Sequence, residues 1–172
     1  MEEIVWQGRF ITTKRDGKWE YVSRSRDIEA AVIVAIDEDE EGRHIVLVEQ
    51  YRVPLGAWCI ELPAGLVGDD HAGEAIRVAA ARELEEETGY RAEHLTLIGR
   101  FASSPGMVSE TFTLVKADGL DKVGAGGGID DEDIIVHRVK LEDVPAFIAA
   151  RRADGAMIDV KLLLLLAGDI IG

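Results

Sequence analysis

The stretch GDDHAGEAIRVAAARELEEETGY, residues 68 to 90, decides the fold because its pattern predicts an α-helix that carries a row of acids. At about 100° per residue, Glu83, Glu86 and Glu87 fall on one face of that helix. Glu83 and Glu87 are four residues apart, where like charges repel, and the row ends beside Gly89, at the negative end of the helix dipole. A divalent cation binds oxygen ligands and would turn this repulsion into coordination. We therefore expect a metal site on the acidic face.

The spacing of the same stretch is more informative than its charge. Five residues separate Gly68 from Glu74, and seven separate Glu74 from Arg82. The remaining positions of the pattern are Glu83, Leu84, Glu86, Glu87, Gly89 and Tyr90. This is a complete match to the Nudix box, so the chain resembles the Nudix hydrolases. A solvated acidic helix face would explain the charge run but not the glycines and the arginine at these offsets.

The resemblance implies roles for the box residues. In Nudix hydrolases the glutamates that match Glu83, Glu86 and Glu87 hold Mg²⁺ or Mn²⁺, and the arginine that matches Arg82 orients them. We expect Arg82 and Glu83 to be catalytic residues on this ground. Arg82 can also form a simple ion pair with Glu86 one helical turn away, and both interpretations can hold together.

The pattern along the chain predicts an α+β fold, an α/β/α sandwich with a mixed sheet between helices. Strands are expected at 4–12, 18–24, 30–36, 44–51, 57–62, 94–101, 111–116 and 134–140, and helices at 72–88, 142–151 and 158–167. The first two strands form an antiparallel hairpin across Arg15-Asp16-Gly17. Asp69 or Asp70 is expected to cap the box helix, and Gly89 fits the left-handed position after its end. Residues 1–172 form one Nudix domain in this interpretation, with residues 1–28 as N-terminal strands and a candidate dimerisation hairpin.

The composition limits the partners of the protein. With 19 basic and 33 acidic residues, the formal net charge is −14. This charge argues against a nucleic acid or an anionic membrane as partner, since both would be repelled. A phosphorylated small molecule could bind only where metals and local arginines reverse the sign of the pocket.

Cysteine content and apolar runs bear on the compartment. Cys59 is the only cysteine, lies between Trp58 and Ile60, and is expected to be a buried core thiol. The N-terminal segment lacks the pattern of a signal peptide, and the apolar run Leu162–Leu166 is far shorter than the roughly 20 residues of a membrane span. That run predicts a buried terminal helix, and a cytoplasmic location is expected.

Motifs outside the box narrow the resemblance. The stretches WEYVSR at 19–24, EQYR at 49–52, ELPAGLV at 61–67 and SSPG at 103–106 resemble the ADP-ribose pyrophosphatase branch, as does Pro105, sixteen residues after Gly89. The resemblance implies that the Ala64 carbonyl is a further metal ligand and that Arg52 and Arg24 contact the substrate. It also makes Trp19 a candidate for contact with the base. The alternatives are a plain turn at Ala64, solvated arginines and hairpin packing of Trp19.

The general base is expected in a loop, because this branch takes it from outside the box. The loop would span 118–132, where the glycines at 124 and 126–128 give backbone freedom, and Glu132 aligns with the glutamate of the branch. The neighbouring aspartates at 130, 131 and 133 leave an offset of one or two positions open. Glu110 is the second candidate.

These observations support an Mg²⁺-dependent or Mn²⁺-dependent hydrolase of ADP-ribose or a related nucleoside diphosphate sugar. GDP-mannose or another nucleotide sugar is an alternative substrate, and a sensing module without turnover is an alternative outside the enzymes. The resemblance also implies a homodimer formed through the N-terminal strands, where Trp6, Trp19 and Tyr21 could supply an aromatic surface.

Overall fold

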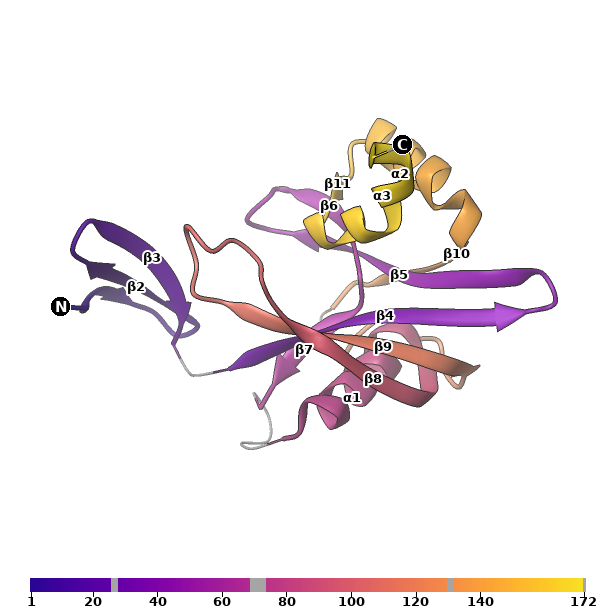
Figure 1. The fold of residues 1–172 in the computed structure, drawn as a ribbon, viewed down its shortest axis with the longest axis horizontal. Helices are drawn as coiled ribbons and strands as arrows, with labels where there is room; N and C mark the ends of the chain where they lie inside the picture. The colour runs from indigo at the N-terminus through magenta and orange to yellow at the C-terminus, as the bar shows by residue number, and fades with distance from the viewer. Residues whose placement is uncertain (26–27, 69–73, 130–131, 172) are drawn as a thin grey trace.

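A large twisted sheet lies between helices, and a small separate sheet extends from its N-terminal side (Figure 1). The structure is a computed structural model that describes residues 1–25, 28–68, 74–129 and 132–171. The strands are β1 (Glu3–Gln7), β2 (Ile11–Asp16), β3 (Trp19–Arg24), β4 (Glu29–Asp39), β5 (Gly42–Arg52), β6 (Ala57–Glu61), β7 (Ala64–Val67), β8 (Tyr90–Ala102), β9 (Thr111–Lys122), β10 (Ile135–Lys140) and β11 (Met157–Ile158). The helices are α1 (Ile76–Thr88), α2 (Val144–Ala153) and α3 (Leu163–Ile171), with 3₁₀ turns η1 (Leu141–Asp143) and η2 (Val160–Leu162).

The large sheet is mixed. Its strand order is β11-β6-β5-β4-β9-β8, with β10 paired to β5 and β7 paired to β4. Strands β4 and β9 run parallel, as do β11 and β6, whereas β5 pairs antiparallel with β4, β6 and β10. The small sheet has the order β1-β2-β3. The predicted mixed sheet is therefore confirmed.

Alternation along β4 divides the core into two layers. Successive side chains of a strand point to opposite faces. Ala31, Ile33 and Ala35 belong to the buried cluster that contains Ala80 and Leu84 of α1. The residues between them face the other cluster, whose members include Val32, Ile36, Val144, Ile148 and Leu162. Helix α1 thus covers one face and α2 with η2 covers the other, which confirms the predicted α/β/α sandwich (Figure 1).

The N-terminal strand expected at 4–12 is wrong. Two strands, β1 and β2, occupy this stretch, and the Gly8 N–H donates to the Ile11 carbonyl at 2.9 Å in the turn between them. The ring of Trp6 lies where a Cβ on residue 8 would stand, so a glycine permits this turn. The predicted hairpin turn is confirmed, because Asp16 pairs with Trp19 and Gly17 has a φ of 58°.

Helix α1 starts later than expected, at Ile76 rather than at residue 72. Ala75 precedes it with an extended backbone, and its carbonyl accepts from the Val78 and Ala79 N–H groups. The prediction of Asp69 or Asp70 as the cap is therefore wrong, and both residues lie outside the described part of the chain. The end of α1 is as predicted, since Gly89 adopts a left-handed φ of 69°.

The C-terminal run of leucines is only partly buried. Leu162 is fully buried in η2, whereas Leu163 and Leu164 are exposed at the start of α3. The expectation of a buried helix is wrong for these two positions, because a short helix lying on a surface must present one side to solvent. Among the helices of the described residues, none has the length and apolar character that crossing a membrane would require.

Candidate active site

Arg82 gathers the acids of α1 around one guanidinium. Its Nη1 lies 2.9 Å from Glu83 Oε1 and 3.0 Å from Glu86 Oε2, and its Nη2 lies 3.4 Å from Glu74 Oε2. The expected i,i+4 pair with Glu86 is present, together with two further pairs. Burial opposes the charge of Arg82, but the three carboxylates outweigh it and raise its pKa. Arg82 is therefore a permanent cation that holds the glutamates in place.

Glu87 joins the helix to strand β7. Its side chain is only 6% exposed, and its Oε2 accepts a hydrogen bond of 3.0 Å from the Ala64 N–H. Burial raises the pKa of Glu87 to about 8, and the charges of Glu83 and Glu132 add to this. Burial, Glu86 and Glu132 likewise raise the pKa of Glu83 against the effect of Arg82. Burial and the neighbouring carboxylates thus both disfavour the charged forms of Glu83 and Glu87.

Gly65 brings the backbone of β7 against Glu83. A Cβ at residue 65 would lie 1.8 Å from the Glu83 Cδ, so only glycine leaves room for the carboxylate. Strand β7 pairs with β4, with Ala64 opposite Val32, which fixes this backbone beside the helix. The segment Ala64-Gly65 and the acidic face of α1 therefore form one wall of the site.

The residues fit a divalent cation by charge and donor type. In the described ranges no three His, Cys, Asp or Glu side chains are grouped as metal ligands, because the glutamates turn toward Arg82 and Ala64. Burial raises the pKa of Glu83 and of Glu87, and neighbouring carboxylates add to the shift, so a bound cation would favour the ionised form of both. Oxygen-only donors of this kind suit Mg²⁺ or Mn²⁺ rather than zinc.

Glu132 belongs to the loop that follows β9. Its Oε2 accepts from the Ile129 N–H at 3.1 Å, and its charge acts on both Glu83 and Glu87. The predicted loop began too early, because β9 continues to Lys122 through its pairing with β8. The neighbouring aspartates 130 and 131 lie outside the described residues.

Arg52 lies close to the acidic face and is held by a buried carboxylate. Its Nε and Nη2 donate to the two oxygens of Glu61 at 2.6 and 2.8 Å. The Glu61 side chain is buried, at 8% exposed, whereas 42% of the Arg52 side chain is exposed. The Glu61 carboxylate raises the pKa of Arg52, and the charge of Glu87 adds to this. One face of this guanidinium therefore remains open to a further anion.

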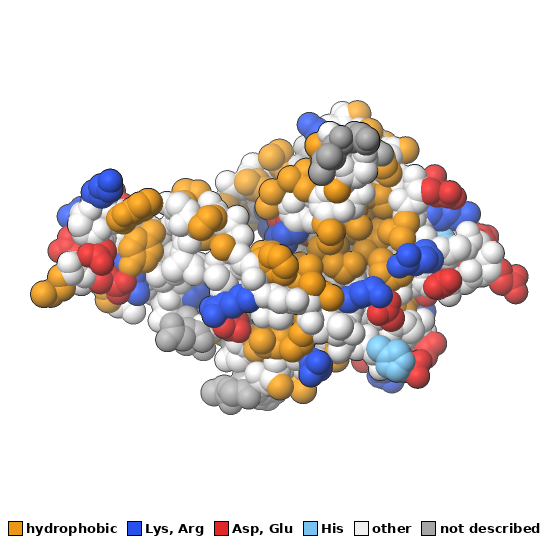
Figure 2. Space-filling model, in the orientation of Figure 1, with side chains coloured by type: hydrophobic (Ala, Val, Ile, Leu, Met, Phe, Trp, Pro, Cys, Tyr) orange, Lys and Arg blue, Asp and Glu red, His pale blue; other side chains and the backbone are white. Residues whose placement is uncertain are grey.

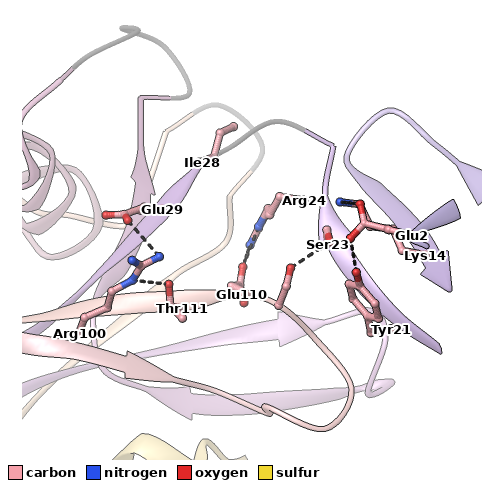
Figure 3. A pocket seen from close by; sticks show the side chains of 11 residues that line it. Glu2, Lys14, Tyr21, Ser23, Arg24, Ile28, Glu29, Arg100, Glu110 and Thr111 are labelled. Carbon is pink, nitrogen blue, oxygen red and sulfur yellow. Dashed lines mark hydrogen bonds and ion pairs between the residues drawn. The ribbon is translucent and has the colours of Figure 1, made fainter. Parts of the chain in front are cut away.

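Arg24 and Glu110 meet in a separate hollow between the small sheet and the large one. Arg24 Nε and Nη2 lie 2.7 and 2.6 Å from Glu110 Oε1, and the two side chains point toward one another (Figure 3). The hollow has a volume of about 370 Å³ and also contains Lys14 and Arg100. Trp19 lines an adjacent hollow of about 600 Å³ with Tyr21 and Pro105. Hydrogen bonds in the described chain do not join Arg24 or Glu110 to the acidic face.

A model of a known protein family matches most of the chain. The family model of the NUDIX domain matches residues 27–159. The chain belongs to the Nudix family. Its box residues are Gly68, Glu74, Arg82 and the glutamates of α1, and the structure brings the last two groups together.

Several proteins similar to this Nudix protein are named for an activity. The methanol dehydrogenase activator of Bacillus methanolicus is 38% identical over 124 residues, which cover 72% of this chain and 64% of the relative. The ADP-ribose pyrophosphatase of Bacillus subtilis is 36% identical over 122 residues, covering 70% and 62%. The chain thus spans about three fifths of the length of these curated relatives. A solved structure described as an ADP compounds hydrolase aligns with a TM-score of 0.68 at 25% identity, covering 100% of this chain and 92% of that one.

Two features of the Nudix site have no clear signal in the sequence. Glu61 holds Arg52, although the register of β5 and β6 places Val48 opposite Glu61 and Ala57 opposite Arg52. Lys122 contacts the end of α1 from 34 residues away. The motif ELPAGLV includes Glu61 but does not indicate which residue it contacts. The order and register of the strands alone would not have predicted the contact of Glu61 with Arg52 or that of Lys122 with Thr88.

Proposed function

We propose that this Nudix protein is a divalent-metal-dependent hydrolase of nucleoside diphosphate sugars, with ADP-ribose as its substrate. The observation that carries the proposal is the acidic face of α1, where Arg82 pairs with Glu83 and Glu86, and the buried Glu87 accepts from the Ala64 N–H. Carboxylate oxygens gathered in this way suit a divalent cation. The relatives named ADP-ribose pyrophosphatase and ADP-sugar pyrophosphatase support the substrate class.

The reaction adds one water across the pyrophosphate. A bond forms between the water oxygen and phosphorus, the bridging P–O bond breaks, and ADP-ribose gives AMP and ribose 5-phosphate. Mg²⁺ or Mn²⁺, held by Glu83, Glu86, Glu87 and the Ala64 carbonyl, would neutralise the phosphate charge. Glu132 accepts the proton of the water in this proposal, because it is a carboxylate close enough to act electrostatically on the acidic face.

The arginines bind the substrate. Arg52 offers the open side of its guanidinium to a phosphate, since Glu61 occupies the other side. Arg24 and Glu110 together would recognise the sugar or base, because their pair lines the hollow beside the small sheet (Figure 3). Trp19 would stack against the base, as its ring is 57% exposed over the neighbouring hollow.

GDP-mannose is the second candidate substrate. The GDP-mannose pyrophosphatase of Cronobacter sakazakii is 31% identical over 167 residues, which cover 90% of this chain and 81% of the relative. That match covers more of the chain than the matches to the ADP-ribose pyrophosphatase of Bacillus subtilis or the ADP-sugar pyrophosphatase of Mus musculus.

A product assay distinguishes these functions. The protein is incubated with Mg²⁺ or Mn²⁺ and a panel of nucleotide sugars, with an EDTA-treated control, and the products are separated. AMP with ribose 5-phosphate supports the proposal, whereas GMP with mannose 1-phosphate supports the second substrate. Metal-dependent binding without product would indicate a sensing module, and neither binding nor product would contradict the whole proposal.

We also infer a homodimer that forms through residues 1–28, the N-terminal strands of a single domain. Figure 2 shows hydrophobic side chains on the surface of the small sheet. Trp6 of β1 is 55% exposed, and Phe10, in the turn before β2, is 61% exposed. Light scattering of the wild-type protein and of Trp6→Glu tests this, and a monomeric wild type would contradict it.

The net charge of −14 supports a small-molecule substrate rather than a nucleic acid or an anionic membrane. The reduced Cys59 agrees with the cytoplasm, and cell fractionation tests that location.

A further inference from the structure

The loop after β9 completes the C-terminal end of α1. The last four carbonyls of an α-helix have no donor within the helix. In α1 the carbonyl of Glu85 accepts from the Gly89 N–H at 2.8 Å. The other three accept from the segment 122–128: Glu86 from Gly128 N at 3.0 Å, Glu87 from Gly127 N at 2.8 Å, and Thr88 from Lys122 Nζ at 2.6 Å. The loop is therefore bound to the helix through the backbone of two metal-binding positions.

The glycines of this segment allow a close fit. Gly126 has a φ of 72°, and a Cβ there would lie 2.4 Å from the Thr88 carbonyl carbon. A Cβ on Gly89 would lie 2.2 Å from the Gly124 oxygen. Both obstacles are backbone atoms, which cannot move aside as a flexible side chain could. The glycines thus serve contact with the helix, in addition to the backbone freedom expected from their sequence.

Lys122 is the charged part of this contact. Its Nζ lies 2.6 Å from the Thr88 oxygen, 3.3 Å from the Ala125 oxygen and 4.4 Å from the centre of the Tyr90 ring. The last turn of α1 has no basic residue of its own, although cations stabilise the negative end of a helix. Lys122 supplies that cation from β9 and contacts the helix end, the loop and the start of β8 at once.

The same loop carries Glu132. Its Oε2 accepts from Ile129 N at 3.1 Å, and a Cβ on Gly128 would lie 2.5 Å from that oxygen. The Glu132 N–H donates to the Ile129 carbonyl at 3.1 Å, and the Ile134 N–H donates to the Gly127 carbonyl at 3.3 Å. The position of Glu132 relative to Glu83, Glu86 and Glu87 therefore depends on how the loop is held.

We propose that Lys122 is a positioning residue, which holds the loop of Glu132 on the end of α1 so that the base and the acidic face keep one fixed geometry. The proposal rests on the proposed function for its effect on turnover. The contact itself is independent of that function and can be measured without substrate. Lys122 does not touch the reacting atoms in this account, and acts through Glu132.

Three lysine variants test the contact. Lys122→Met keeps the length of the side chain and removes its charge, Lys122→Arg restores a cation, and Lys116→Met is a matched control on β9, whose lysine pairs with Asp118. In Lys122→Met we expect hydrogen exchange in the peptide 123–129 to accelerate by about tenfold or more, because the loop opens more often. Lys122→Arg should restore most of the protection, and Lys116→Met should leave it unchanged. Wild-type exchange in Lys122→Met would overturn the proposal.

Kinetics then test the link to Glu132. In Lys122→Met, kcat should fall by about tenfold or more, while KM and the Mn²⁺ dissociation constant change by less than about threefold, because the substrate and metal residues stay in place. In a Glu132→Gln background the same substitution should change kcat by less than about twofold, because the glutamine side chain cannot accept a proton and its position no longer affects turnover. Equal effects in both backgrounds, or a matching loss of metal affinity, would overturn the positioning role.

The two readouts separate this inference from the proposed function. If the wild type cleaves no nucleotide sugar, the proposed function fails, and the exchange measurement still decides whether Lys122 holds the loop. If the wild type is active and Lys122→Met remains fully active, the proposed function stands and the inference fails. Thermal unfolding of each variant confirms that all measurements are made on folded protein.

Discussion

The Ala64 backbone N–H donates to the Glu87 carboxylate across 3.0 Å, which joins the start of β7 to the last turn of α1. This bond places a backbone donor against a carboxylate that is otherwise buried and surrounded by acids. One hydrogen bond lowers the pKa of Glu87, but burial dominates and leaves it raised to about 8. Without a cation, Glu87 therefore favours its protonated form in the folded state.

The first prediction concerns the stability of the metal-free protein. The folded pKa of Glu87, about 8, lies above its ordinary value of 4.5, so the folded state binds this proton more tightly than the unfolded state. The free energy of unfolding should therefore fall as pH rises from about 5 to 8, by at most about 1.4 kcal/mol per pH unit from this group. Urea unfolding in EDTA at several pH values measures this. In Glu87→Gln the free energy of unfolding should fall less steeply with pH, because this group no longer titrates. If the two proteins showed the same dependence on pH, the prediction would be contradicted.

Metal binding should show the opposite pH dependence. A proton and a divalent cation compete for the same carboxylates, so Mn²⁺ should raise the melting temperature more at pH 8 than at pH 6. Calorimetric melting with and without Mn²⁺ measures the difference. The effect should be much smaller in Glu87→Gln, and a wild-type rise that is independent of pH would be evidence against Glu87 as a ligand.

Gly65→Ala should separate metal binding from stability. The added Cβ would lie 1.8 Å from the Glu83 Cδ, and the flexible end of this side chain can move aside where backbone could not. We expect Mn²⁺ affinity to fall by about tenfold or more, with a loss of stability below about 1 kcal/mol. Isothermal titration and urea unfolding measure the two effects. Gly168→Ala is the matched control, because its Cβ would meet no atom within 4 Å.

Glu132→Gln tests the general base. The amide keeps the size of the side chain but cannot accept the proton, so kcat should fall by about a hundredfold or more while KM changes little. Steady-state kinetics with ADP-ribose and Mg²⁺ measure both constants. Glu110→Gln serves for comparison, since Glu110 pairs with Arg24 and should mainly raise KM. Nearly normal turnover in Glu132→Gln would show that another residue is the general base.

The sequence predicted the acidic helix because its chemistry is local. Glu83, Glu86 and Glu87 lie within one helical turn, and their spacing alone places them on one face. The start of α1 was predicted too early because the N-cap residue is Ala75, which has an extended backbone and no side chain that could cap the helix. The N-terminal strand was predicted as continuous because polar and apolar residues alternate through residues 4–12 and give no sign of a turn. The structure has a turn there, in which the Gly8 N–H donates to the Ile11 carbonyl.

Contacts between distant segments were harder to predict. Lys122 reaches Thr88 only because β9 pairs with β8, which begins immediately after the helix and Gly89. A lysine at the end of a strand has no local signature of such a role. The glycines at 124 and 126–128 suggested a mobile loop, whereas their close fit to the helix depends on tertiary packing. The sequence predicts which residues form the site, and the structure adds the contacts that hold the loop after β9 on the end of α1.

The last prediction concerns Cys59, which is 3% exposed in β6. Burial raises the pKa of its thiol to about 12, and the charges of Glu61 and Asp159 add to the shift. Because the thiolate is the reactive form, labelling of the folded protein at pH 8 by a disulfide reagent should be at least about a thousandfold slower than labelling in urea. The variant Glu40→Cys supplies an exposed thiol in the same protein for comparison. If Cys59 reacted as fast as that exposed thiol in the folded protein, its burial in the core would be contradicted.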